Sequence, residues 1–278
     1  MTVTSANQFD KQADFTHHVV SSLRQSREYH EFIFTGVPPS WADAVYQLTD
    51  EKIPSRKSYN SKSRELQIKV KHTEITNCIQ PWLFKLPLGW LLNGDITLEE
   101  EELFYGSVGT NGDGCLVAFL AEWFDNSLYF RSGPYSGSWK EPDFFFRAEH
   151  DYLPTLAVES GWSESKEQLH KGMGLLLVGG NGSTNVVIIV QWTRLQGARV
   201  SGTVELFVRD SNGMPTLQQS ETIFPRPATR NDLWIRRRDL FGPALVPGRN
   251  GNDMLYFNVE KLRDYATRTL GFMDLVPA

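Results

Sequence analysis

Apolar residues recur at helical spacing in four segments of the chain. Phe15, Val19 and Leu23 lie four residues apart and predict a helix over residues 13–28. A second short helix is expected from Ser40, a residue type that caps helix N-termini, to residue 48. Two further helices are predicted over residues 163–177, ended by Gly179-Gly180, and over residues 259–270.

Short apolar and aromatic runs in the middle of the chain predict strands over residues 103–108, 115–124, 127–130, 144–146 and 156–158. The run VVIIVQW, residues 186–192, is apolar at nearly every position and predicts a central strand buried on both faces. Residues 199–209 alternate and predict a neighbouring strand. Residues 65–90 fit helix or strand, and the polar stretch 51–64 favours a solvated loop.

This order of elements predicts an α/β fold with a central mixed β-sheet flanked by helices. The sheet is expected to contain the strands near 103–146, 156–159, 186–192 and 200–208. We expect a single domain over residues 1–278, with a helical N-terminal elaboration at about 13–90 and a core at about 100–270.

Composition restricts the setting and the partners. The 278 residues carry a net charge of −5, so no overall positive field attracts nucleic acid or anionic lipid, and a polyanion needs a local basic patch. Cys78 and Cys115 are far apart, match no metal-ligand spacing and favour a reducing compartment. No apolar run approaches the length of a membrane span. We therefore expect a cytoplasmic or nuclear protein without a membrane partner.

Two carboxylates are candidates for a metal site. Asp143 follows Pro142 just before a predicted strand, and Glu159 directly follows the apolar run of the next one. A hairpin can bring residues 16 positions apart together, and two carboxylates with a substrate phosphate can hold Mg²⁺ or Mn²⁺. Alternatively, Asp143 simply starts a turn. Glu159 is harder to explain as a structural residue, because a buried acid needs a partner.

The order of these elements resembles that of the PD-(D/E)XK nuclease-like superfamily, which has the restriction-endonuclease fold. The chain is most similar to the fungal proteins of that type, whose hallmark is a Pro-Asp pair followed by LPTLVVEVG-SES. Here Pro142-Asp143 is followed by LPTLAVESGWSES at residues 153–165. The resemblance covers about residues 141–209. It implies a restriction-endonuclease-like core with Asp143 and Glu159 as its metal ligands.

The catalytic lysine of that superfamily is missing from its expected places. Gly161 stands two positions after Glu159, and the strand position used by many fungal relatives is Gln191. Lys171 and Lys166 of the predicted helix remain as substitutes, although a solvated side chain is the more ordinary role for either. Gln191 can orient water or phosphate, or it can be a neutral replacement that keeps the fold after metal chemistry was lost.

Basic and aromatic residues suggest two kinds of ligand. Arg236, Arg237 and Arg238 form a basic run near Trp234 that can contact a nucleic-acid backbone, although an exposed charged strand is the commoner explanation. The chain has eight tryptophans, including Trp162 and Trp192, and several of them can line a pocket for a small apolar organic molecule.

Two functions follow as hypotheses. The first is a Mg²⁺- or Mn²⁺-dependent phosphodiesterase on nucleic acid, with Asp143, Glu159, Gln191 and Lys171 at the catalytic site. The second is a nuclease-fold protein without nuclease activity or cofactor, reused as a biosynthetic cyclase, isomerase or binding protein. In the second, Glu159 or Asp143 serves as general acid or base in an aromatic pocket.

Overall fold

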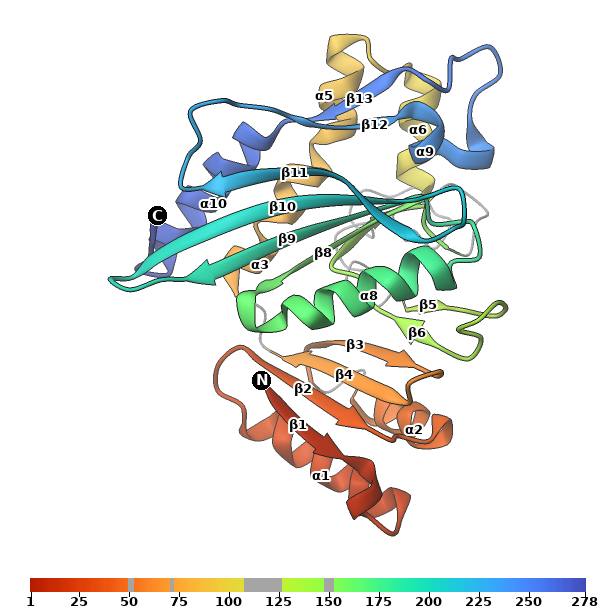
Figure 1. Ribbon diagram of the computed structural model, residues 1–278, viewed down its shortest axis with the longest axis vertical. Coiled ribbons are helices and arrows are strands. Elements are labelled where there is room, and N and C mark those ends of the chain that lie inside the picture. Colours follow the sequence, from red (N-terminus) through yellow and green to blue (C-terminus); the bar gives the residue numbers. More distant parts are fainter. Residues whose placement is uncertain (50–52, 71–72, 108–126, 148–152) are drawn as a thin grey trace. The chain divides into compact units, whose positions relative to one another are not determined.

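The computed structural model describes residues 1–49, 53–70, 73–107, 127–147 and 153–278 of the chain (Figure 1). These residues fall into two units. The first unit is built from residues 1–73 and 127–141, and the second from the described residues of 74–126 and 142–278. Each unit has its own mixed β-sheet with helices packed against it, which confirms the predicted α/β class.

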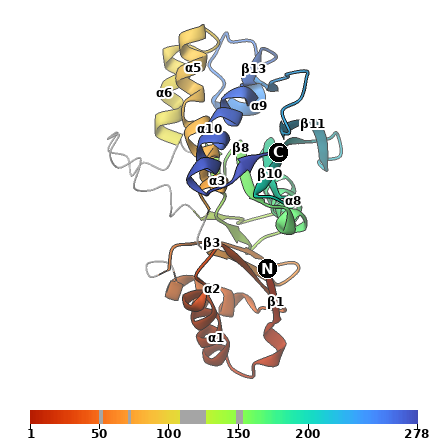
Figure 2. The same ribbon diagram turned by 90° about the vertical axis from the view of Figure 1, so that its left-hand side faces the viewer.

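The first unit is a six-stranded sheet in the order β1–β2–β4–β3–β6–β5. Only the β1–β2 pair is parallel; the others are antiparallel. Its strands are β1 (Thr2–Ser5), β2 (His30–Thr35), β3 (Ser55–Asn60), β4 (Glu65–Val70), β5 (Leu128–Tyr129) and β6 (Trp139–Lys140). Helices α1 (Gln12–Gln25) and α2 (Pro39–Thr49) cover one face, where Phe15 and Val45 pack with Phe34 and Ile68 (Figure 2).

The helical elaboration predicted over residues 13–90 therefore contains three strands, and the loop predicted over residues 51–64 is wrong. Strand β3 lies inside that polar stretch. Its Lys57 is only 3% exposed, because the ammonium lies 3.6 Å from Glu141 Oε1 and the Lys57 backbone N–H donates to Glu141 Oε2 at 2.8 Å. The charge that suggested solvent exposure is neutralised by a carboxylate 84 residues away in the sequence.

The second unit has a main sheet in the order β11–β10–β9–β8–β7, with β14 paired to β10, and a separate β12–β13 ribbon. Its strands are β7 (Phe144–Phe146), β8 (Leu156–Trp162), β9 (Val186–Arg194), β10 (Arg199–Arg209), β11 (Pro215–Phe224), β12 (Leu233–Arg236), β13 (Met254–Phe257) and β14 (Val276–Pro277). Strands β8 and β9 are parallel neighbours, and β9 lies between β8 and β10. The predicted central position of VVIIVQW is therefore confirmed.

Helices cover both faces of this sheet. Figures 1 and 2 show α8 on one face and α3 with α10 on the other. The helices of the unit are α3 (Glu74–Asn77), α4 (Ile79–Phe84), α5 (Leu86–Asn93), α6 (Leu98–Ser107), α8 (Lys166–Gly179), α9 (Arg237–Phe241) and α10 (Val259–Phe272). Helix α8 starts after the predicted position because residues 163–165 form a 3₁₀ turn, and it ends at the predicted glycines. None of the helices in the described ranges has the length and apolar character needed to cross a membrane.

Two further strand predictions need correction. Residues 103–107 belong to helix α6 instead of a strand, because Thr97 and Glu100 cap the start of this helix. Strands β5 and β6 belong to the sheet of the first unit, so the single sheet predicted to include residues 103–146 is in fact two sheets. The strand predicted over residues 115–124 lies outside the described residues.

Candidate functional site

Asp143 and Glu159 come together through the pairing of β7 with β8. These strands are antiparallel, with Phe144 opposite Val158. Extending this register by one residue places Asp143 opposite Glu159. Both carboxylates are buried, with Asp143 8% and Glu159 1% exposed. The hairpin therefore places the two carboxylates on neighbouring strands, as the sequence predicts.

Asp143 is held in place by the main chain of the neighbouring strand. The backbone N–H of Ser160 donates a hydrogen bond of 2.8 Å to Asp143 Oδ2, in a buried environment. A carboxylate fixed in this way loses little conformational freedom on binding a cation, and its second oxygen does not take part in this bond.

Gly161, two residues after Glu159, has little free space beside it for a side chain. Side chains alternate along a strand, so position 161 faces the same side of the sheet as Glu159. A Cβ on Gly161 would lie 3.3 Å from Leu169 Cδ2 and 3.4 Å from Ser165 Oγ. Leu169 belongs to α8, so this helix occupies the space that a longer side chain at 161 would need.

Gln191 lies beside Gly161 on the neighbouring strand β9. It pairs with Gly161, while Ile189 pairs with Glu159, so the Gln191 side chain projects from the same face as Glu159. Gln191 is partly buried. Within the described part of the chain, no hydrogen bond joins its amide to the Glu159 carboxylate.

The two lysines of α8 lie on its outer side. Lys166 and Lys171 are exposed, and the Lys171 ammonium is 3.2 Å from the carboxylate of Glu167, one helical turn earlier. The residues of α8 that face the sheet are mainly apolar, including Leu169 and Leu176. Lys171 is therefore placed as a surface residue in this structure.

Trp192 is a core residue. It is fully buried, its indole N–H donates to Ser160 Oγ at 3.3 Å, and its ring lies so close to Gly202 that a Cβ there would be 2.6 Å away. Trp192 also faces the side of the sheet opposite to Gln191. Trp162, its register partner on β8, is 8% exposed. Neither tryptophan presents an open ring surface to a ligand.

The arginine run at 236–238 separates into three environments. Arg236 is partly exposed and donates from Nε to Asp239 Oδ2 at 2.9 Å. Arg237 is buried, and Arg238 is exposed. Of this run, only Arg236 and Arg238 have side chains that a polyanion could reach.

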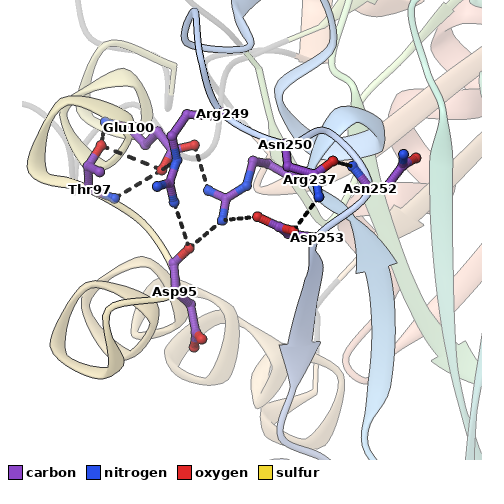
Figure 3. A network of polar contacts seen from close by, with 8 residues as sticks. All are labelled: Asp95, Thr97, Glu100, Arg237, Arg249, Asn250, Asn252 and Asp253. Atoms are coloured by element: carbon purple, nitrogen blue, oxygen red, sulfur yellow. Dashed lines mark hydrogen bonds and ion pairs between the residues drawn. The ribbon is translucent and has the colours of Figure 1, made fainter.

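Figure 3 shows the polar network that holds Arg237. Its Nη1 lies 2.6 Å from Glu100 Oε1, and its Nη2 donates to the main-chain carbonyl of Asp95 at 2.6 Å. Arg249 approaches the other oxygen of Glu100, with Nε 3.2 Å from Oε2. Glu100 is fully buried. The network ties α6 to α9 and to the loop before β13, which is a structural role.

Sequence analysis did not find this network, although part of it had a signal. Thr97 and Glu100 have the T-x-x-E spacing of a capping box, and both reciprocal hydrogen bonds are present: Thr97 N–H to Glu100 Oε2 and Glu100 N–H to Thr97 Oγ1. The long-range partners Arg237 and Arg249 have no such local signal.

The carboxylate pair is a minimal donor set for a metal. Among the residues that the structure describes, no group of three or more His, Cys, Asp or Glu side chains could hold an ion. Magnesium is commonly bound by one or two carboxylates together with water and substrate phosphates. Asp143 and Glu159 supply two carboxylates of this kind, so any further ligands of a cation there would come from solvent and substrate.

Comparison with known proteins assigns no family. No family model matches the chain, and no curated protein is significantly similar to it.

Proposed function

We propose that the second unit binds Mg²⁺ or Mn²⁺ through Asp143 and Glu159 and cleaves phosphodiester bonds in nucleic acid. The observation that carries this proposal is the β7–β8 register, which puts two buried carboxylates opposite each other. A cytoplasmic or nuclear location, where nucleic acid is present, is part of this proposal.

Each neighbouring residue has a distinct role in this proposal. The Ser160 N–H orients Asp143, and Glu159 is the second metal ligand. The bound metal would polarise the phosphoryl oxygen. The Gln191 amide, on the same face as Glu159, can orient a water molecule or a phosphate oxygen but cannot neutralise developing charge as a lysine would. Arg238, and to a lesser degree Arg236, can contact the nucleic-acid backbone.

Metal binding is the first test. Calorimetric titration of the whole protein with MnCl₂ should show a site that disappears in Asp143→Asn and Glu159→Gln. Both variants keep the shape of the side chain, and the amide oxygen introduced by Asp143→Asn can still accept the Ser160 N–H. Glu205→Gln is the matched control, because Glu205 is a partly buried carboxylate of the same sheet paired with His170 at 3.7 Å. Absence of binding at millimolar Mn²⁺, or equal loss in the control, would refute the metal site.

Cleavage is the second test. A fluorescent oligonucleotide incubated with the protein and Mn²⁺ should be cut slowly, and Asp143→Asn should reduce the rate at least about a hundredfold, as expected on losing a metal ligand. Metal binding without any cleavage would support the metal site but contradict the proposed nuclease activity.

A second candidate function is supported by the missing lysine. Positions 161 and 191 are Gly and Gln, and the lysines of α8 are exposed on its outer side. The same pair would then serve a small organic substrate in a cyclase or isomerase, with Glu159 or Asp143 as general acid or base. This function needs no metal, so a protein that binds no Mn²⁺ would favour it.

A further inference from the structure

A pocket of about 570 Å³ lies in the second unit, between α4–α5 and the start of α10. We call it the α5–α10 pocket. Its volume is within the range of small-molecule sites. It shares no lining residue with the Asp143–Glu159 pair, so any ligand bound here would have a separate function.

Two tryptophans build the inner wall of the pocket and hold it in shape. The indole N–H of Trp82 donates to the Asn258 carbonyl at 2.9 Å, and that of Trp90 donates to the Tyr256 carbonyl at 2.8 Å. Both rings are almost completely buried and pack near Phe257. Because both indoles are anchored to the main chain where β13 joins α10, the pocket is preformed.

The rim of the pocket carries cations around an aromatic ring. The Lys85 ammonium lies 5.5 Å from the centre of the Tyr265 ring, and the Arg268 guanidinium lies 5.7 Å from it. Lys261 lines the same pocket. Within the described ranges of the chain, none of these three cations forms an ion pair with a carboxylate. Their charges are therefore available to an anionic group.

Hydrogen-bond acceptors complete the lining. The main-chain carbonyl of Asp95 accepts hydrogen bonds from Arg237 and Arg249. The Asp95 carboxylate points away from both arginines (Figure 3). Asp264 lines the pocket from α10, and its carboxylate has no ion-pair partner among the described residues. These two carboxylates can accept hydrogen bonds from hydroxyl or amino groups of a ligand.

The lining disfavours a purely apolar ligand, because burying charged side chains without partners costs free energy. Six lining residues are charged: Lys85, Asp95, Asp232, Lys261, Asp264 and Arg268. The exposed Tyr256 offers stacking for a planar ring. We propose that the α5–α10 pocket binds an aromatic phosphate of mononucleotide size, with its phosphate at Lys85, Lys261 and Arg268 and its ring against Tyr256.

Gly89 provides a clean way to close the pocket. It lines the pocket from α5, has no positive φ, and a Cβ placed on it would meet no atom within 4 Å. The β-carbon of a leucine therefore fits at position 89, and we expect the rest of the Gly89→Leu side chain to fill part of the pocket. Replacing a helical glycine does not lower helix propensity. Gly174→Leu in α8 is the matched control, because Gly174 is also a helical glycine with open space and lies outside the pocket.

Calorimetric titration with adenosine monophosphate tests the proposal. We expect adenosine monophosphate to bind with a Kd on the order of 0.1 mM. Adenosine, which lacks the phosphate, and ribose 5-phosphate, which lacks the aromatic ring, should each bind at least about tenfold more weakly. Gly89→Leu should abolish the binding, while Gly174→Leu and Asp143→Asn should leave it unchanged. Lys85→Gln combined with Arg268→Gln should weaken the monophosphate more than the nucleoside.

Three results would overturn the proposal. They are absence of binding at millimolar monophosphate, equally tight binding of adenosine, and full binding by Gly89→Leu. Thermal melting of both glycine variants checks that each is folded. Because Asp143→Asn tests the metal site and Gly89→Leu tests the pocket, failure of one proposal does not affect the other.

Discussion

Gln191 lies on the same face of the sheet as Glu159, one strand away and two residues further along. A lysine at position 191 would project from the same face of the sheet as the carboxylate pair. This position is only partly buried. If the pair binds metal, we expect Gln191→Lys to raise Mn²⁺-dependent cleavage of an oligonucleotide by about tenfold or more, because the cation stabilises developing negative charge.

Thr203→Lys is the matched control for this gain. Thr203 is opposite Gln191 on β10 and faces the same side, but it is one strand further from Glu159. An equal gain in both variants would mean that added positive charge only improves nucleic-acid binding. A lysine at Gly161 is not an equivalent test, because Leu169 occupies the space beside that position.

The parts of the fold that the sequence predicted correctly are those with a strong local pattern. Strand β10 shows clear alternation and helix α10 clear helical spacing, and the almost entirely apolar run of β9 indicated a buried element. Strand β3 was missed because its burial depends on Glu141, which is distant in the sequence. The carboxylate pair was predictable because a hairpin brings it together locally, whereas the α5–α10 pocket combines residues 82–95 with residues 232–268, which are far apart in the sequence.

Glu100 is expected to be essential for the stability of the second unit. Removing it leaves the buried Arg237 guanidinium without its main counter-ion and leaves the Thr97 N–H uncapped. We therefore expect Glu100→Ala to lower the free energy of unfolding by about 3–5 kcal/mol, measured by urea denaturation. Glu99→Ala, an exposed acid in the same helical turn, should cost less than about 1 kcal/mol. Similar losses in the two variants would contradict a structural role for the network.

Glu141 should make the stability of the first unit depend on pH. Burial raises the pKa of its carboxyl above the ordinary value of 4.5, and Lys57, Arg56 and the Ser127 hydroxyl offset part of this effect. The folded protein therefore binds this proton more readily than the unfolded chain. Between pH 4.5 and the raised pKa, the contribution of Glu141 to the free energy of unfolding increases as the pH falls.

The comparison of wild type with Glu141→Gln isolates this effect from other titrating groups. Relative to the variant, the wild type should lose stability as the pH rises through that window, as measured by urea unfolding at several pH values. Glu28→Gln removes an exposed carboxylate of the same unit and should show no such trend. A wild type that gains stability relative to Glu141→Gln with rising pH would show that the pKa is lowered instead.

Gly202 is required by the fully buried Trp192 ring. The two residues are register partners on β9 and β10, and a Cβ at 202 would lie 2.6 Å from the indole. The ring cannot move aside easily, because its N–H donates to Ser160 Oγ and a second contact, Ile223, lies 3.4 Å from the same point. We expect Gly202→Ala to lower the free energy of unfolding by about 1–3 kcal/mol, the usual cost of overpacking a core.

The Gly202 substitution should also affect the proposed metal site, because Ser160 connects Trp192 to Asp143. The Ser160 hydroxyl accepts a hydrogen bond from the Trp192 indole, and the Ser160 backbone N–H donates one to Asp143. Calorimetry should therefore show weaker Mn²⁺ binding in Gly202→Ala than in the wild type. Gly174→Ala, in open space on α8, is the control: it should leave Mn²⁺ binding unchanged and be neutral or stabilising, because alanine is the better helix former. Unchanged stability in Gly202→Ala would show that the indole can be displaced and that it does not fix the position of Ser160.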